Sequence, residues 1–200
     1  MRSPRQARPE PRGITSGRTA PCHLVYGHGY GSRRRPRRRG VKPRQDLELR
    51  PGRPDEAAAL TALALRSKAH WGYDEAFLAA CVDELTVREG DTEGGRTAVA
   101  EGDGRVLGFA TLSGEPPEGA LGMMFVEPDA IGRGVGRILF EHTMAQAGRL
   151  GFEALTIDAD PNAEPFYTAM GAVRIGATPS GSVPGRELPL LRIVFGAQPG

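Results

Sequence analysis

The stretch VEPDAIGRGVGRILFEHTMAQ, residues 126–146, decides the fold, because Gly132, Gly134 and Gly136 stand there at alternate positions before a helix-like run. A glycine inside a helix costs about 1 kcal/mol relative to alanine, so three of them at a helix start need a compensating role. The preceding run GALGMMFVE (119–127) is apolar and stops at Pro128, which cannot donate to a sheet and is tolerated mainly at strand ends. The pattern predicts a buried strand, a glycine loop and a helix in succession.

The glycine loop has the features of an anion site. A helix N-terminus offers unpaired N–H groups and partial positive charge, and alternate glycines let the backbone approach a phosphate closely. Arg133 and Arg137 add positive charge. The spacing is neither G-x-G-x-x-G nor G-x-x-x-x-G-K-[ST], so dinucleotide and nucleoside triphosphate loops match poorly. By itself the loop predicts a phosphate or pyrophosphate cradle, with a flexible turn as the alternative.

The rest of the chain alternates between strand-like and helix-like patterns. Asp74 is a plausible N-cap for the second helix, and GDGR (102–105) has the composition of a hairpin turn. Val135, Ile138, Leu139 and His142 are expected to share one face of the helix after the glycine loop. In order, we expect strand 45–50, helices 54–68 and 74–85, strands 97–101, 105–113 and 119–127, helix 135–150, strand 153–158, helix 162–171, and strands 172–178 and 188–195. This β-α-α-β-β-β-α-β-α-β-β order predicts an α/β fold of the α+β kind, a mixed sheet with helices on its faces.

The two parts of the chain differ in charge. Residues 1–44 hold twelve arginines and one lysine against a single acid, whereas residues 45–200 hold 13 basic and 23 acidic residues. The first part is rich in Arg, Pro and Gly and cannot bury enough apolar surface to fold, so we expect a disordered Arg-rich tail and a folded domain over 45–200. The tail is either an arm for nucleic acid or an anionic surface, or an accidental extension. Because it has no interleaved aromatic residues and the domain is acidic, a nucleic-acid partner is not expected.

Several classes of protein are not expected from this sequence. The first thirty residues lack the apolar run of a secretory signal, and no run approaches the ~18 apolar residues of a membrane span. Two cysteines, Cys22 and Cys81, make neither a disulfide framework nor a metal set. We therefore expect a cytoplasmic protein with no membrane segment and no metal.

Two motifs together resemble the GNAT superfamily of N-acetyltransferases. That family's loop reads Gln or Arg, two residues, Gly, any residue, then Gly or Ala, and it follows the fourth strand. The frame here runs from Ile131 to Gly136, with Ile131 where Gln or Arg is usual. About thirty residues on, LTIDADPNAEPFYTAMGAVRIG (155–176) is similar to the family's second half, with Asn-Ala, Phe-Tyr and a glycine that ends the short helix. The resemblance covers about residues 46–195 and implies the acyl-coenzyme A N-acyltransferase fold, splayed between its fourth and fifth strands.

The resemblance also implies a donor site for acetyl-coenzyme A as co-substrate. Its pantetheine arm would pair with backbone groups of Met124, Phe125 and Val126, and the thioester would lie near Tyr167 and Asn162. The pyrophosphate would bind the amides of the loop residues Arg133, Gly134, Val135, Gly136 and Arg137.

Two residues are candidates for proton transfer. Tyr167 would protonate the departing thiolate, with a merely packed aromatic ring as the alternative. Glu127, directly or through a water, would be the base, with a solvated acid at a strand end as the alternative. Asn162 has the alternative role of a helix cap.

In the family, the first two helices and the last hairpin wall the acceptor side. His70, Trp71, Tyr73 and the acids Asp74 and Glu75 would offer aromatic and acidic groups that hold a cation. Alternatively, Trp71 fills the core between the helices and His70 is exposed at a helix end. Arg186 would hold a carboxylate or fix its loop.

The expected function is transfer of an acetyl group to a primary amine of a small molecule or peptide, by direct attack in a ternary complex. The alternative is a coenzyme A binding or sensor domain without transfer activity. Apart from the acceptor, a second copy of the chain is the one partner left open.

Overall fold

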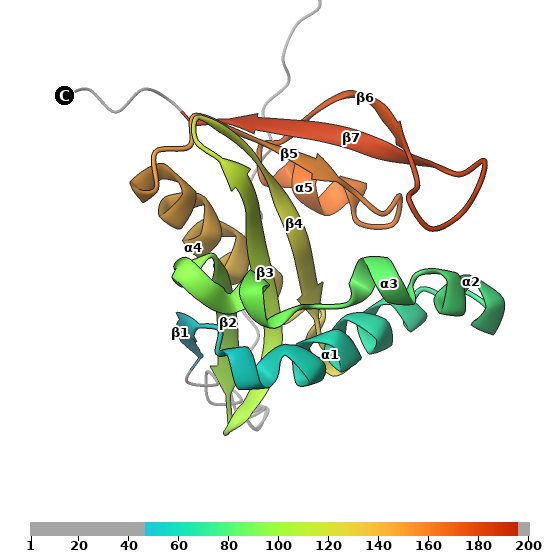
Figure 1. Ribbon diagram of the computed structural model, residues 1–200, viewed down its shortest axis with the longest axis horizontal. Coiled ribbons are helices and arrows are strands. Elements are labelled where there is room, and N and C mark those ends of the chain that lie inside the picture. Colours follow the sequence, from blue (N-terminus) through green and yellow to red (C-terminus); the bar gives the residue numbers. More distant parts are fainter. Residues whose placement is uncertain (1–46, 196–200) are drawn as a thin grey trace, which may run out of the picture. The chain divides into compact units, whose positions relative to one another are not determined.

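The computed structural model describes residues 47–195. Its elements run, in order, β1 (Glu48–Pro51), α1 (Ala57–Ala69), α2 (Glu75–Ala80), α3 (Val82–Leu85), β2 (Thr97–Gly102), β3 (Arg105–Glu115), β4 (Glu118–Val126), α4 (Val135–Arg149), β5 (Ala154–Asp158), α5 (Glu164–Ala169), β6 (Val173–Pro179) and β7 (Glu187–Val194) (Figure 1). The predicted α/β order is confirmed. The expected second helix is split at Cys81 into α2 and α3. The predicted tail, 1–44, lies outside the described residues, and the division at residue 45 stays a prediction.

The seven strands that the described region contains form one mixed sheet, in the order β1-β2-β3-β4-β5-β7-β6. Every neighbouring pair is antiparallel except β4 and β5, which are parallel. A parallel connection needs a crossover, and α4 supplies it.

The sheet opens between β4 and β5. Their pairing runs only from Glu118 opposite Ala154 to Ala120 opposite Thr156. Beyond that point β4 stays paired with β3 on its other side, but no strand pairs with Leu121–Val126 on the β5 side. The register of β3 and β4 leaves Gly122 as an extra residue at the start of the opening. Such a bulge bends a strand, which accounts for the divergence of β4 from β5.

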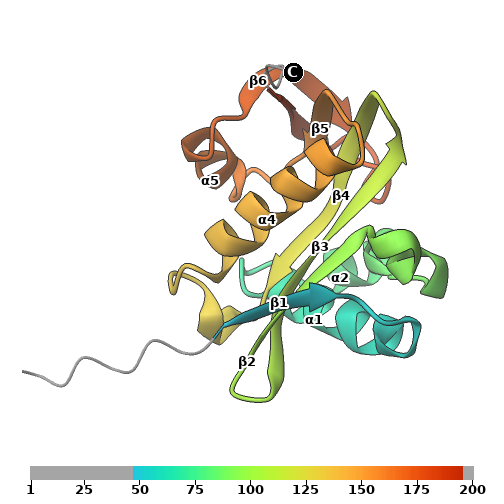
Figure 2. The ribbon, with the colours of Figure 1, turned by 90° about the vertical axis from the view of Figure 1, so that its left-hand side faces the viewer.

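Helices cover both faces of the sheet. Figure 2 shows α4 and α5 on one side and α1 and α2 on the other. Leu60 and Leu63 of α1 pack with Phe109 of β3, while Leu139 of α4 packs with Leu107 on the opposite face. Each of these leucines is at most 1% exposed, and burying such a side chain contributes about 1.5–3 kcal/mol.

The buried face of α4 differs from the predicted one. Val135 and Leu139 are buried as expected, but Ile138 is 40% exposed and His142 is only partly buried. The buried positions continue to Thr143 and Ala147. Val135, Leu139, Thr143 and Ala147 follow steps of four along the helix, and Phe140 is buried beside them. Ile138 and His142 fall on the flank of this stripe.

Candidate functional site

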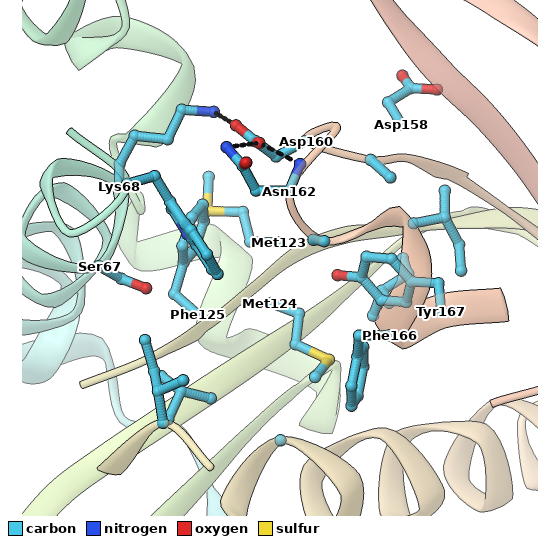
Figure 3. Close-up of a pocket in the computed structure, with 18 of the residues that line it drawn as sticks. Ser67, Lys68, Met123, Met124, Phe125, Asp158, Asp160, Asn162, Phe166 and Tyr167 are labelled. Carbon is cyan, nitrogen blue, oxygen red and sulfur yellow. Dashed lines mark hydrogen bonds and ion pairs between the residues drawn. The ribbon is translucent and has the colours of Figure 1, made fainter. Parts of the chain in front are cut away.

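The opening between β4 and β5 leads into a cavity of about 420 Å³ (Figure 3). Its walls come from the end of α1, from α3, from β4, from the glycine loop, and from β5 with α5. The glycine loop lies along one stretch of the wall, and the loop after β5 lies along another. The cavity therefore joins the two motifs that the sequence analysis singled out.

The glycine loop is shaped by two left-handed glycines. Gly132 has a φ of 77° and Gly134, the N-cap of α4, has a φ of 90°. A Cβ placed on either would meet no atom within 4 Å, so open space faces the loop. The first-turn amides of Val135 to Arg137 have no carbonyl in a preceding turn to bond. The amide of Arg133, in contrast, donates to the Ala130 carbonyl at 3.2 Å. The loop thus offers free amides at the helix start and space for a ligand.

Most of the predicted donor-site residues meet in this cavity. Arg133 and Val135 are not part of the lining; the Arg133 side chain is exposed, and Val135 is buried in the core under α4. Ile131, which stands where the family has a polar residue, lines the cavity and is 37% exposed. The lining includes the predicted residues Met124, Phe125, Val126, Gly134, Gly136, Arg137, Asn162 and Tyr167.

Tyr167 places a hydroxyl inside the cavity. The residue is 7% exposed and its ring packs at 5.2 Å from Phe166 and 6.1 Å from Phe140, measured between centroids. Figure 3 shows the hydroxyl directed into the cavity, and within residues 47–195 no hydrogen bond engages it. Burial, and secondly the charge of Asp160, raise the pKa of Tyr167 above its ordinary value. The hydroxyl is therefore a proton donor at neutral pH, held by a packed ring.

Asp160, in the connection from β5 to α5, is the centre of a polar network. It accepts from Lys68 Nζ at 2.7 Å, from the Tyr73 hydroxyl at 2.9 Å, and from the backbone and side-chain nitrogens of Asn162 at 2.9 and 3.0 Å. Burial alone would raise the pKa of Asp160, but the Lys68 and Asn162 hydrogen bonds outweigh it and hold that pKa below its ordinary value. Asp160 is thus an ionised carboxylate that joins α1 to the β5–α5 connection.

Asn162 belongs to this network and is not the cap of α5. The N-cap is Ala163, which makes no side-chain cap bond. The Asn162 side chain donates to Asp160 and to the Tyr73 hydroxyl, the latter at 3.2 Å. The cap alternative was therefore wrong, and the Asn162 side chain instead links the β5–α5 connection to Tyr73 in the α1–α2 connection.

Tyr73 and Arg186 lie behind Asp160. An Arg186 nitrogen donates to the Tyr73 hydroxyl at 2.9 Å and lies 3.4 Å from Asp160. Its guanidinium also lies over the rings of Tyr73 and Phe77, 5.1 and 4.7 Å from their centroids. Neither Tyr73 nor Arg186 lines the cavity. Both contact Asp160, and one Arg186 nitrogen is engaged by Tyr73 and Asp160 while the guanidinium lies over the two rings.

The α1–α2 connection places the other predicted acceptor residues at the surface. Trp71 is 43% exposed and lines the cavity, so it does not fill the core between the helices. His70 is exposed and meets Trp71 edge to face, with 5.4 Å between ring centroids. Asp74 caps α2 by accepting from the Phe77 amide at 2.8 Å, as predicted.

Glu127, the candidate base, directly follows β4 and contacts Arg66 of α1. Its carboxylate accepts from Arg66 Nε at 3.3 Å and forms a second bond with the same guanidinium. The Glu127 hydrogen bond in turn raises the pKa of Arg66. Glu127 is not among the residues that line the cavity.

Four charged residues of the cavity wall were missed by the sequence analysis, namely Lys68, Glu84, Asp158 and Asp160. The alternating acids of TIDAD (156–160), at the end of a predicted strand, were a signal for Asp158 and Asp160. Lys68 and Glu84 gave no such signal, because a charged residue on a helix is usually solvated.

Two further properties concern the described region. None of its helices has both the length and the apolar character to cross a membrane. Among residues 47–195 no three or more His, Cys, Asp or Glu side chains are grouped so that they could hold a metal ion.

Comparisons with known proteins agree with this architecture. The family model described as "Acetyltransferase (GNAT) family" matches residues 62–172. A GCN5-related N-acetyltransferase from Rhodopseudomonas palustris is 28% identical, with a TM-score of 0.63 over 78% of this chain and 100% of its own. The PaiA N-acetyltransferase from Thermoplasma acidophilum, solved with coenzyme A, shares the fold at 14% identity, with a TM-score of 0.61 over 75% of this chain and 99% of its own.

YncA from Salmonella typhimurium, a structure that contains acetyl-coenzyme A, also shares the fold, at 19% identity and a TM-score of 0.56 over 78% of this chain and 98% of its own. A comparison with curated protein sequences gives no match. The family model spans more than half of the chain and includes both the glycine loop and Tyr167. The chain belongs to the GNAT family of acetyltransferases.

Proposed function

We propose that the protein is an N-acetyltransferase that moves an acetyl group from acetyl-coenzyme A to a primary amine of a small molecule or peptide, by direct attack in a ternary complex. The observation that carries the proposal is one continuous cavity. It has free helix-start amides and open glycines along one wall and the unbonded Tyr167 hydroxyl on another. Between them runs the unpaired edge of β4.

The residues present fit acetyl-coenzyme A. The amides of Val135 to Arg137, with the open space at Gly132 and Gly134, suit a pyrophosphate at the start of α4. The β4 backbone from Met124 to Val126 has no strand partner on the β5 side and could pair with the amides of a pantetheine arm as an added strand does. The backbone, rather than polar side chains, would do most of the binding, which is consistent with an isoleucine at position 131.

The chemistry requires three proton transfers, because the amine nitrogen loses one proton before it attacks and one afterwards, and the departing sulfur gains one. The thioester supplies an activated acyl carbon, and as the amine nitrogen forms the new C–N bond the C–S bond breaks. Tyr167 would give its hydroxyl proton to the departing sulfur, and its raised pKa ensures that the hydroxyl is protonated at neutral pH. Once the C–N bond has formed, the nitrogen loses its second proton, and this proton, relayed by water, would restore the Tyr167 hydroxyl.

The attacking amine must first lose a proton. An amine with a lysine-like pKa of ~10.4 is charged at pH 7, and freeing its lone pair costs roughly 4.6 kcal/mol. Glu127 is the proposed base. Since its carboxylate is bound to Arg66 and is not part of the cavity wall, it would act through a water rather than directly.

The test combines binding with turnover. Acetyl-coenzyme A at saturating concentration is expected to raise the unfolding temperature, and a panel of amines (amino acids, diamines, aminoglycosides, peptide N-termini) is then screened by release of free thiol. Stabilisation with thiol release for at least one amine supports the proposal. Stabilisation without release for any amine favours the alternative, a coenzyme A binding or sensor domain. No stabilisation at all contradicts both.

A further inference from the structure

The carboxylates of the cavity wall differ in their partners. Asp160 is neutralised by Lys68 Nζ at 2.7 Å and by Arg186 at 3.4 Å. Glu84 of α3 and Asp158 at the end of β5 also line the cavity, yet within residues 47–195 neither forms a salt bridge with a basic side chain. The part of the wall that holds these two acids is therefore negative and uncompensated.

Asp158 is affected by the charge of Glu84. Burial, and secondly the charge of Glu84, raise the pKa of Asp158. Glu84 accepts a hydrogen bond from Ser182 in the β6–β7 connection, which ties α3 to that loop and fixes the carboxylate. Like charges held near one another are costly, and a cation between them would relieve the cost.

An independent feature shows that a polar ligand group is expected in the same cavity. Tyr167 is 7% exposed, and its hydroxyl points into the cavity and has no hydrogen-bond partner within the described region. A buried hydroxyl without a partner costs free energy, which a bound group can recover. The reacting atoms of a ligand are thus expected within reach of Tyr167, in a cavity that also contains the two unpaired acids.

We propose that Glu84 and Asp158 bind a second cationic group of the acceptor, so that the preferred substrates are amines that carry a further positive charge. This inference rests on the proposed function and specifies its substrate class. The exposed face of Trp71, which also lines the cavity, would add a cation–π contact.

An acceptor with a carboxylate does not suit this wall. Arg186, which the sequence offered for that role, already donates to the Tyr73 hydroxyl at 2.9 Å and lies over the Phe77 ring. Lys68 is bonded to Asp160. On this part of the wall an anionic group would meet Glu84 and Asp158, neither of which has a salt-bridge partner within the described region, and a lysine already bonded to Asp160.

The test uses three amines of one chain length that differ in charge at the far end: 1,4-diaminobutane, n-butylamine and 4-aminobutanoate. Two readouts are taken at fixed ionic strength. One is kcat/KM from thiol release, and the other is the shift in unfolding temperature of the coenzyme A-loaded protein. The diamine is expected to exceed the other two by about tenfold in kcat/KM and to give the largest shift.

Variants localise the effect. Glu84→Gln and Asp158→Asn are each expected to raise KM for the diamine about three- to tenfold and to leave n-butylamine unchanged, because only the far charge is affected. Glu153→Gln removes an exposed acid that does not line the cavity and serves as the matched control. High salt is expected to reduce the diamine preference.

The outcomes separate the two proposals. If the protein binds acetyl-coenzyme A and acetylates amines but treats the three probes alike, or binds none of them at millimolar concentration, the cationic-acceptor inference is wrong and the proposed function stands. A preference for 4-aminobutanoate also overturns the inference, in favour of Arg186 as a carboxylate site. Failure to bind acetyl-coenzyme A in the unmodified protein overturns the proposed function, and the inference with it.

Discussion

Two regions of the cavity wall differ in whether the backbone or the side chains form them. At the glycine loop, the wall is backbone: two left-handed glycines and the first amides of α4, all within residues 131–137. Around Asp160, the wall depends on side chains: Lys68, which lines the cavity, and Tyr73 and Arg186, which do not, converge on one carboxylate from segments 92, 87 and 26 residues away along the chain. The first is the proposed donor site, and the second lies on the side proposed for the acceptor.

This difference explains what each region tolerates. A backbone site depends on φ angles and on the absence of Cβ atoms, so its side chains can vary, as Ile131 does. A side-chain network depends on every partner, because an unpaired charge left in a half-buried site is costly. We therefore expect changes in the loop to alter cofactor affinity and changes around Asp160 to alter stability and acceptor use.

The largest effect is expected at Tyr167, which lies between the two regions. Tyr167→Phe removes the hydroxyl but keeps the ring contacts with Phe140 and Phe166. Loss of a general acid lowers kcat by about 100-fold, while acetyl-coenzyme A affinity changes little. Steady-state kinetics with calorimetric titration of acetyl-coenzyme A measures both. Unchanged kcat would remove Tyr167 from the mechanism.

Gly134→Val tests the backbone site. A β-branched residue at a φ of 90° is strained, and relief of that strain would displace the loop. Acetyl-coenzyme A affinity is expected to fall about tenfold or more. Gly104→Val is the matched control, because Gly104 has a φ of 73° with open space and is not part of the cavity wall. Both variants should lose stability, and equal affinity in both would contradict a backbone donor site.

Glu127→Gln tests whether removal of the amine proton depends on the Glu127 carboxylate. If a water relays the proton to Glu127, kcat/KM falls about tenfold near pH 7 and the loss shrinks at high pH, where more of the amine is already neutral. A pH profile of kcat/KM for both proteins is the measurement. Parallel profiles that differ only by a constant factor would indicate that Glu127 merely anchors Arg66.

The smallest effect is expected from Asp160→Asn, which leaves Lys68 and Arg186 without their carboxylate. We expect the free energy of unfolding at pH 7 to fall by about 1–2 kcal/mol, less than for a fully buried pair. Because the pKa of Asp160 is depressed in the folded state, its stabilisation is present above the ordinary pKa of 3.8 and is lost as the pH falls below it.

Denaturant unfolding of the two proteins from pH 7 to pH 3 should therefore show a difference that closes at the acid end. Asp74→Asn is the control, since asparagine caps a helix as well as aspartate does. A difference in the free energy of unfolding that is the same at every pH would show that the charge of Asp160 is not what stabilises the site.

The same contrast determines how much could be predicted from the sequence. The strand before Pro128, the glycine loop and the helix after it are local patterns, and the order of elements followed from them and was confirmed. The N-cap at Asp74 is also a local pattern, and this prediction was confirmed. Asn162 was predicted to lie near the thioester, with a helix cap as the alternative, and Tyr73 was predicted to contact the substrate. Neither prediction included the network that joins them, because the partners are distant in sequence.

The sequence also did not determine which side chains would be buried. Periodicity placed Ile138 on the core face of α4, but the direction of a buried stripe depends on how the helix lies on the sheet. Trp71 is large and apolar and was a plausible core residue, yet the break after α1 leaves it at the cavity mouth. The exposure of Ile138 and of Trp71 therefore depends on tertiary packing and could not be predicted from a few neighbouring residues.

Direct transfer in a single cavity is the central claim, and a single-turnover experiment tests it. Protein in excess over acetyl-coenzyme A is mixed with an accepted amine, quenched at intervals and analysed by mass spectrometry. The account predicts that acetylated amine and free coenzyme A appear together, at one rate, with no acetyl group on the protein. An acetylated protein that forms before the product, or bound acetyl-coenzyme A that never yields acetylated amine, would contradict it.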